Sequence, residues 1–189
     1  MVALTYIFVT NSNTLFMTVI MDFAHDRGVE LDKAVYLLSG FATADIAGRL
    51  SCGWVADTGL LAKKTIVGLC CTIFGVVMQV TPLCTHYVGL MCACISIGYA
   101  YGNSVVLFSV LVADGVGVKR IPAAMGLMTF FCGLTAFGRP ALIGYFRDNI
   151  GSYDNMLRAV GLVLLVIGLT WLLLRFLERS RNRSFNLRA

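Results

Sequence analysis

The sequence predicts an all-α polytopic membrane protein, with six transmembrane helices. Hydropathy, segment length and charge content support this fold class. The chain has 189 residues, of which 58% are hydrophobic and 13% are charged, and its mean hydropathy is +0.82. This charged share is about half that of a typical soluble domain. Several segments also reach about 20 predominantly apolar residues, which is the length that spans a bilayer core.

Six apolar segments are predicted to be helices, and the short connections between them carry most of the charge. The segments are residues 1–22, 34–57, 65–82, 87–111, 122–146 and 156–176. Together they form one predicted transmembrane domain, residues 1–178, which is followed by a basic tail at 179–189. Pro140 lies inside the fifth segment, where a proline interrupts the helix and frees a backbone carbonyl.

The distribution of basic residues predicts the orientation in the bilayer. The second connection, the fourth connection and the C-terminal end lie on one side and carry Lys63, Lys64, Lys119, Arg120, Arg175, Arg179, Arg181, Arg183 and Arg188. The opposite side carries only Arg27, Lys33, Arg147 and Arg158. Because basic residues are enriched in cytoplasmic loops, the C-terminus is predicted to be cytoplasmic. The basic residues are therefore interpreted as topology signals. The sequence has no patch of interleaved aromatic and basic residues of the kind that would indicate nucleic-acid binding.

The stretch FATADIAGRLSCGWVAD (41–57) places two charges inside an apolar helix. Asp45 lies near the middle of the second segment, and Arg49 follows four residues later on the same helix face. Charged residues at this depth are costly and usually mark transport pathways. Two hypotheses remain open: a structural ion pair that fixes helix packing, or an Arg49 that binds an anionic substrate. In the second, Asp45 either takes a proton or holds Arg49 while the site is empty.

No chemistry typical of an enzyme is evident. The chain contains no nucleophile motif, no metal-ligand set and no phosphate-binding loop, so neither a cofactor nor a metal site is predicted. The seven cysteines lie mostly inside apolar segments. They are interpreted as small apolar packing residues and not as a disulfide framework.

Three stretches share motifs, in order and spacing, with one transporter family: YLLSGFATADIAGRLSCGWVAD (36–57), YVGLMCACISIGYAYGNSVVL (87–107) and residues 112–155. The third contains Asp114, Gly117, Ala124, Gly126, Leu127, Gly138, Pro140, Gly144, Asp148, Gly151 and Tyr153. Over residues 5–178 the chain resembles the C-terminal six-helix half of the monocarboxylate transporters, a branch of the major facilitator superfamily.

This resemblance implies a function and roles for particular residues. Family members move lactate, pyruvate and ketone bodies, usually with a proton, and other members carry other organic solutes. By resemblance, Arg49 contacts the substrate anion, Asp45 is its proton-coupled partner, and Tyr101 shapes selectivity. The resemblance also implies a plasma-membrane location, an N-terminal six-helix half and a single-span ancillary glycoprotein as partner.

Two candidate site residues leave alternatives open. Arg139 stands where the family pattern has a second proline after glycine. It would face the cavity as a second anion anchor, pair with Asp45, or extend to the outer interface. Asn103, beside Tyr101, either lines the substrate path or makes interhelical hydrogen bonds, and the same choice applies to the polar run at residues 10–14.

The connection after the second helix resembles a degraded superfamily motif. Gly53, Asp57, Lys63 and Lys64 match its glycine, acid and basic positions, and in the superfamily this motif is a cytoplasmic conformational latch. The alternative is a helix end followed by lysines that only set the orientation.

The function predicted from these features is secondary transport of a monocarboxylate or a related organic solute, as part of a twelve-helix transporter. Since the sequence enters a helix at its start, we expect the other half to lie upstream of Met1. The alternatives are a non-transporting six-helix isoform or membrane interaction protein, and a channel assembled from identical chains.

Overall fold

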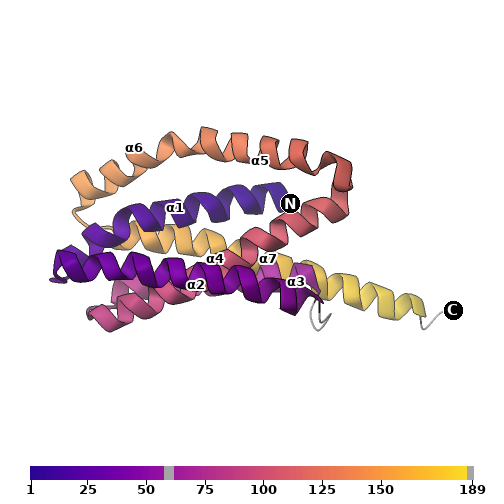
Figure 1. Ribbon diagram of the computed structural model, residues 1–189, viewed down its shortest axis with the longest axis horizontal. Coiled ribbons are helices and arrows are strands. Elements are labelled where there is room, and N and C mark those ends of the chain that lie inside the picture. Colours follow the sequence, from indigo (N-terminus) through magenta and orange to yellow (C-terminus); the bar gives the residue numbers. More distant parts are fainter. Residues whose placement is uncertain (58–61, 187–189) are drawn as a thin grey trace.

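The computed structural model describes the backbone of residues 1–57 and 62–186, and the side chains of residues 1–54 and 62–180. All regular structure in these ranges is helical (Figure 1). The long helices are α1 (Val2–Asp26), α2 (Leu31–Asp57), α3 (Lys63–Val80), α4 (Tyr87–Val116), α5 (Ile121–Ala136), α6 (Gly138–Tyr145) and α7 (Asp154–Asn186). Single turns follow at Thr81–Leu83, Val118–Arg120 and Phe146–Ile150. The prediction of an all-helical fold is confirmed.

The helices extend beyond the apolar segments that predicted them. For example, α1 continues to Asp26 and α7 continues to Asn186, because polar residues past the apolar span still satisfy their backbone hydrogen bonds within the helix. The connection between α1 and α2 is therefore short. It turns at Gly28, whose φ of +77° is a conformation that side chains other than glycine rarely adopt.

The fifth predicted helix is divided into α5 and α6. Helix α5 ends at Ala136, the chain turns at Phe137, and α6 begins at Gly138. The cause is Pro140, which has no N–H to bond the carbonyl of Ala136 four residues earlier. The predicted interruption of this helix is confirmed, and it places Arg139 in the first turn of α6.

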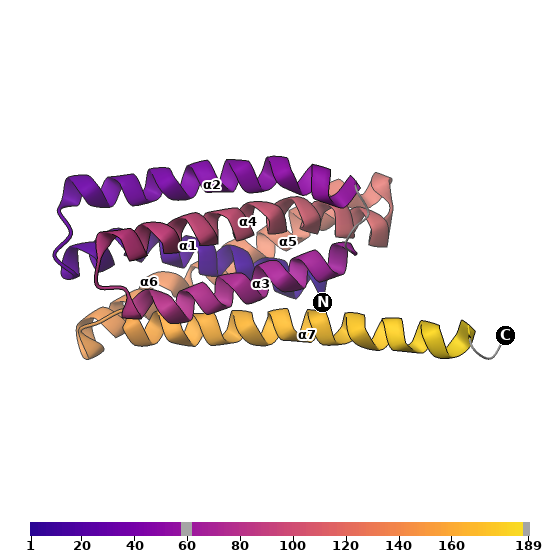
Figure 2. The same ribbon diagram turned by 90° about the horizontal axis from the view of Figure 1, so that it is seen from below.

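Helices α2 and α4 lie in close contact along their length (Figure 2). The contact depends on glycines from both helices. A Cβ on Gly48 would lie 2.5 Å from the carbonyl oxygen of Tyr99, and a Cβ on Gly98 would lie 2.4 Å from that of Phe41. Such small residues let backbones approach closely, which is how helices associate in lipid.

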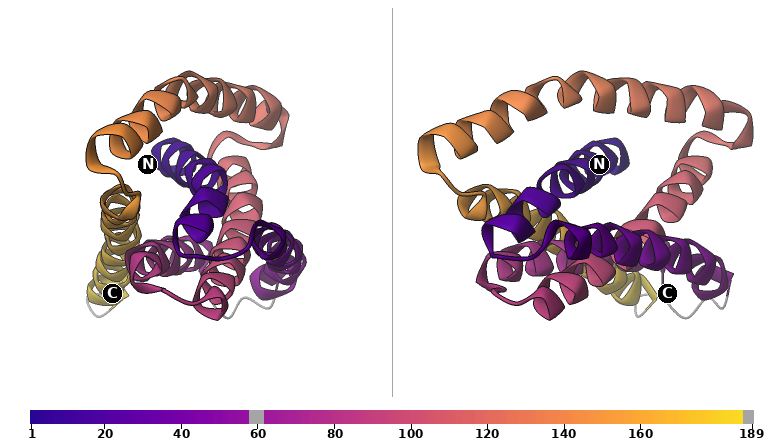
Figure 3. Two further views of the ribbon diagram at one scale, coloured as in Figure 1. Left: turned by 90° about the vertical axis from the view of Figure 1, so that its left-hand side faces the viewer. Right: turned by 60° about the vertical axis from the view of Figure 1, so that its left-hand side comes forward.

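Helices α3 and α7 form a second close pair. A Cβ on Gly75 would lie 2.7 Å from the backbone nitrogen of Leu165, and one on Gly168 would lie 2.4 Å from Oγ1 of Thr72. The two pairs, α2–α4 and α3–α7, are joined through contacts between α3 and α4. They form the compact part of the bundle, and the α5–α6 rod stands apart on one side (Figure 3).

The outer surface of the bundle is apolar. Many large hydrophobic side chains are exposed, among them Leu50, Trp54, Phe130 and Phe176. Among the described residues, five helical segments are long and apolar enough to cross a membrane, judged by length and composition. They are Val2–Asp26, Lys63–Leu83, Tyr87–Val116, Val118–Ile150 and Asp154–Ser180, so α2 is not among them. Its middle carries the charged pair described below, which lowers its hydropathy.

Ion pairs tie the helices together at the end of the bundle where α1 terminates. Arg27 donates to the Asp154 carboxylate at 3.0 Å and to the carbonyl oxygen of Cys84 at 2.9 Å. Arg147 pairs with Asp26. These contacts link the end of α1 to the turn before α4, to the start of α7 and to the turn after α6.

Candidate functional site

The Asp45 and Arg49 side chains form a two-pronged ion pair on α2. Nε of Arg49 donates to both carboxylate oxygens at 3.1 Å, and Nη2 donates to Oδ2 at 2.8 Å. The helix supplies this geometry, because residues four apart are neighbours on one face. A guanidinium and a carboxylate that meet through two nitrogens form a directional, charge-assisted contact.

The two charges differ in their exposure. The side chain of Asp45 is 16% exposed, whereas that of Arg49 is 45% exposed. Asp45 is held against α4 at Gly102, because a Cβ there would lie 2.9 Å from its Oδ1. The carboxylate is therefore positioned by packing, and the guanidinium remains accessible to an anion that approaches this face of the bundle.

Tyr101 of α4 lies beside the pair. Its ring is half-buried and lies 6.4 Å from that of Phe41, at 35°. The next residue, Gly102, packs directly against Asp45. The structure thus brings together three predicted site residues from two helices.

Helix α1 adds two residues to this site that the sequence analysis did not assign individually. Thr10 lies near the Tyr101 phenol, and the Tyr6 ring, one turn earlier on α1, meets Phe108 of α4 edge-on at 5.7 Å. Thr10 belongs to the polar run that the sequence analysis left open between two roles. Tyr6 had no such signal, because an aromatic residue in an apolar helix is ordinary.

Asn103 lies in the contact between α2 and α4. Its side chain is only 4% exposed. Its amide donates to the carbonyl oxygen of Tyr99 at 2.9 Å and lies 3.1 Å from where a Cβ on Gly48 would be. These are contacts of helix packing. The hydrogen bond of Asn103 lies within α4, so both roles considered for this residue from the sequence stay predictions.

Arg139 lies on α6, outside the cluster formed by Asp45, Arg49 and Tyr101. Within the part of the chain that the structure describes, it forms no salt bridge, and its Nε is buried without a hydrogen-bond partner. Asp45 is occupied by Arg49, so the pairing of Arg139 with Asp45 is not observed.

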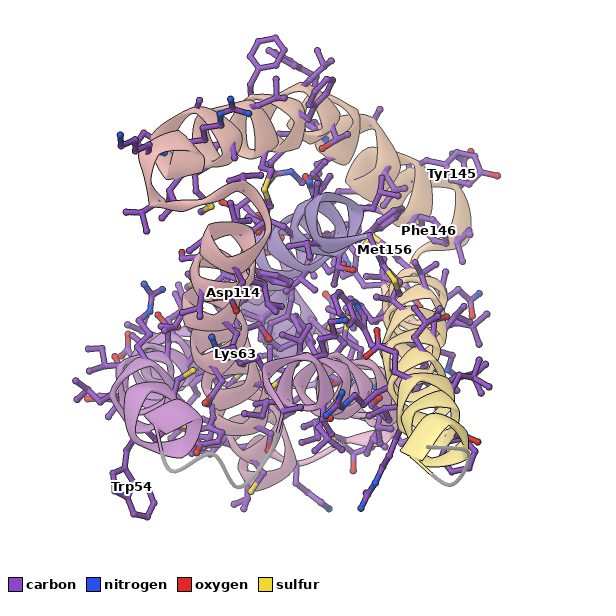
Figure 4. All side chains as sticks on the ribbon, turned by 90° about the vertical axis from the view of Figure 1, so that its right-hand side faces the viewer. Trp54, Lys63, Asp114, Tyr145, Phe146 and Met156 are labelled. Atoms are coloured by element: carbon purple, nitrogen blue, oxygen red, sulfur yellow. The ribbon has the colours of Figure 1, made fainter. Side chains whose placement is uncertain are left out.

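The two lysines of the latch motif form ion pairs with other helices. Lys63 and Asp114 lie near each other (Figure 4). Nζ of Lys63 is 2.9 Å from Oδ2 of Asp114, and Nζ of Lys64 is 2.7 Å from Oε1 of Glu178. Both pairs join α3 to helices of the same bundle, α4 and α7. The side chain of Asp57, the acid of this motif, lies outside the described residues. Gly53 is exposed, with nothing within 4 Å of the position of an added Cβ.

The next features are possible metal ligands and the cysteines. Among the described residues, no group of three or more His, Cys, Asp or Glu side chains is placed to hold a metal ion. All seven cysteines are free thiols, and most are buried.

A bundle of helices long enough to cross a bilayer, with large apolar side chains on its outer surface, is that of a polytopic integral membrane protein. The chain belongs to the Major Facilitator Superfamily, whose family model matches residues 2–188. Monocarboxylate transporter 2 of Rattus norvegicus is 32% identical over 86% of this chain and 35% of its own length. Monocarboxylate transporter 12-B of Danio rerio is 24% identical over 95% of this chain and 39% of its own length. The chain spans little more than a third of the length of these relatives.

Proposed function

We propose that this chain forms one six-helix half of a secondary transporter for small monocarboxylates. The Asp45–Arg49 pair carries the proposal, because it combines a two-pronged hydrogen-bonded geometry with an exposed guanidinium in the middle of α2. A pair with so exposed a guanidinium adds little to stability, so a purely structural role does not account for its place in the middle of the helix. The similarity to proteins named as monocarboxylate transporters supports the substrate class.

The proposed mechanism is a competition for Arg49. In the empty site Asp45 occupies the Nε and Nη2 donors of the guanidinium. A substrate carboxylate offers the same two-pronged contact. When Asp45 accepts a proton it loses its charge, its hold on Arg49 weakens, and the guanidinium is released to the substrate. Proton and anion then bind together, so uptake is coupled to a proton gradient.

Tyr101 is the proposed shape filter of this site. Its half-buried ring rests against Phe41, and the next residue, Gly102, packs against Asp45. A carboxylate held by Arg49 would therefore place its side group against the aromatic face of these rings. A small side group fits this arrangement, and a bulky one requires that the Tyr101 ring be removed.

The proposed transporter works by alternating access. Transporters of this type bind substrate near the bilayer midplane, between two halves that rock against each other. This chain would supply one wall of that cavity and would pair with a second six-helix half. Lys63 and Lys64 would hold α3 to α4 and α7 at the cytoplasmic end. We further propose a plasma-membrane location, a cytoplasmic C-terminus and an ancillary single-span glycoprotein as partner.

The test is uptake of radiolabelled lactate and pyruvate by cells that express the complete reading frame containing this chain. Asp45→Asn and Arg49→Gln should each abolish uptake while cell-surface expression persists. The matched controls are Asp32→Asn, in the first turn of α2, and Arg158→Gln, an exposed residue of α7. Wild-type protein that reaches the surface and takes up no carboxylate would contradict the proposal, and would favour a non-transporting membrane protein.

A further inference from the structure

We infer that the chain has a second binding site, for an amphipathic monocarboxylate, in a cavity beside Arg139. This Arg139 cavity has a volume of about 470 Å³ and lies between α1, α5, α6 and α7. Its walls are mainly apolar and include Ile7, Phe8, Phe131, Leu142, Val160 and Val163. Its volume is within the range of small-molecule sites, about 300–1,000 Å³. It shares no residue with the Asp45–Arg49 site and stands independently of the proposed function.

The cavity exists because α6 does not pack closely against α1 and α7. Figure 1 shows the α5–α6 rod arching over α1. No residue of α6 is buried, and α5 buries only Met128 and Cys132. A hydrogen bond links α1 to α5, because the amide of Asn11 donates to Oγ1 of Thr135 at 2.8 Å.

Two polar groups at the cavity are buried and unsatisfied. Nε of Arg139 and Oδ1 of Asn11 have no hydrogen-bond partner within the described part of the chain. Both residues line the cavity. The Arg139 side chain as a whole is only half-buried, and a carboxylate is the natural acceptor for its guanidinium. The oxygen of Asn11 needs a donor, which a water molecule that hydrates the carboxylate can supply.

A second cavity, of about 500 Å³, lies on the other side of Arg139 and includes Thr18, Arg147, Asp148 and Tyr153. Arg147 is eight residues beyond Arg139, about 12 Å along the helix axis. Arg139 therefore lines both cavities, of which this second one also contains the charged residues Arg147 and Asp148. This arrangement matches a ligand with a charged head at Arg139 and an apolar chain in the Arg139 cavity.

The charged Arg139 side chain and the apolar cavity walls together favour an amphipathic monocarboxylate over other ligands. A neutral acyl chain would fill the apolar walls and leave Nε of Arg139 unpaired. A small hydrophilic anion would pair with Arg139 and leave the apolar walls empty. An amphipathic monocarboxylate satisfies both. It can come from the bilayer, as a single-chain fatty acid, or from water, as a short aromatic acid.

The test is equilibrium binding of radiolabelled dodecanoate to the full chain in phosphatidylcholine nanodiscs. We expect saturable binding at one site, with dodecanol and acetate as poor competitors. Arg139→Gln should weaken binding about tenfold to a hundredfold, since it removes a charge-assisted hydrogen bond. Arg139→Lys should retain part of the affinity. Two control variants should bind dodecanoate as the wild type does. They are Arg175→Gln, which changes an arginine on α7 that does not line the cavity, and Arg49→Gln.

A second variant tests the apolar part and leaves the charge in place. Val163→Phe fills the cavity and should weaken dodecanoate binding while the melting temperature is unchanged. Competition by oleate points to the bilayer as the source, and competition by 3-phenylpropionate points to water. Unchanged binding in Arg139→Gln, or dodecanol that competes as well as dodecanoate, would overturn the inference. Because Arg49→Gln changes only the proposed transport site, dodecanoate binding by this variant reports on the Arg139 cavity even if the proposed transport function is wrong.

Discussion

Asp45 and Gly102 pack so closely that only a glycine fits opposite the acid. A Cβ at position 102 would lie 2.3 Å from the carbonyl oxygen of Asp45 and 2.9 Å from its Oδ1. The carboxylate that holds Arg49 is therefore placed by a residue on a neighbouring helix. The α2–α4 contact and the charged pair form one structural unit, so a change on α4 should act on the chemistry of α2.

The first prediction concerns this contact. Gly102→Ala should separate α2 from α4, displace Asp45, and lower the free energy of unfolding by about 1–3 kcal/mol, as overpacking does in other interiors. The measurement is the melting temperature of the purified protein together with carboxylate uptake. Gly53→Ala is the matched control, because an added Cβ meets nothing within 4 Å there. Equal melting temperatures for the two variants would show that the close approach has no energetic consequence.

The second prediction separates the two roles of the Asp45–Arg49 pair. The double variant Asp45→Arg with Arg49→Asp keeps both charges four residues apart on one helix face. It should recover only part of the melting temperature that Asp45→Arg alone loses, because an arginine at position 45 still crowds Gly102. It should not recover uptake, because the cation moves to that position. Full uptake by the exchanged pair would mean that only the presence of an ion pair matters.

The third prediction concerns selectivity. Tyr101→Ala should raise uptake of bulkier carboxylates relative to lactate, because it removes the ring that rests against Phe41. Competition by a series of carboxylates with increasing side groups would measure this change. Tyr99→Ala, at an exposed tyrosine of the same helix, serves as the control. An unaltered order of substrates in Tyr101→Ala would remove this residue from the site.

The fourth prediction concerns the end of the bundle near Arg27. Arg27→Ala should cost about 1–3 kcal/mol of stability, because it removes the hydrogen-bond donor from a carboxylate and from two partly buried backbone carbonyl groups. Those acceptors are Asp154, Pro82 and Cys84. Lys33→Ala breaks an exposed pair with Glu30, and should cost less than about 1 kcal/mol. Denaturant titration of both variants gives the comparison, and similar losses would contradict it.

Much of the fold could be predicted because each signal is local. Apolar segments of bilayer length predicted the helices, and the missing N–H of Pro140 predicted the break that the structure has after Ala136. The helix ends were less accurate, because α1 and α7 continue through polar residues that hydropathy assigns to the connections.

The candidate site could be predicted only in part. The four-residue spacing of Asp45 and Arg49 was sufficient to predict their pairing, since both lie on one helix. The partners of Lys63 and Lys64 could not be predicted, because Asp114 and Glu178 are distant in sequence. The spacing of Gly98 and Gly102 was available as a signal for a close helix contact, but it does not say which helix or which residue makes that contact.

The sequence by itself determined the class of protein, the number of apolar helical segments and the charged pair on α2. These follow from hydropathy, chain length and the period of the α-helix, which are properties of neighbouring residues. Only the tertiary structure decided that Gly102 positions Asp45, that Asn103 faces a helix contact, and that Arg139 lies unpaired between two cavities. The physical reason is that these relationships depend on how closely separate helices pack, and that closeness is set by pairs of residues far apart in the chain.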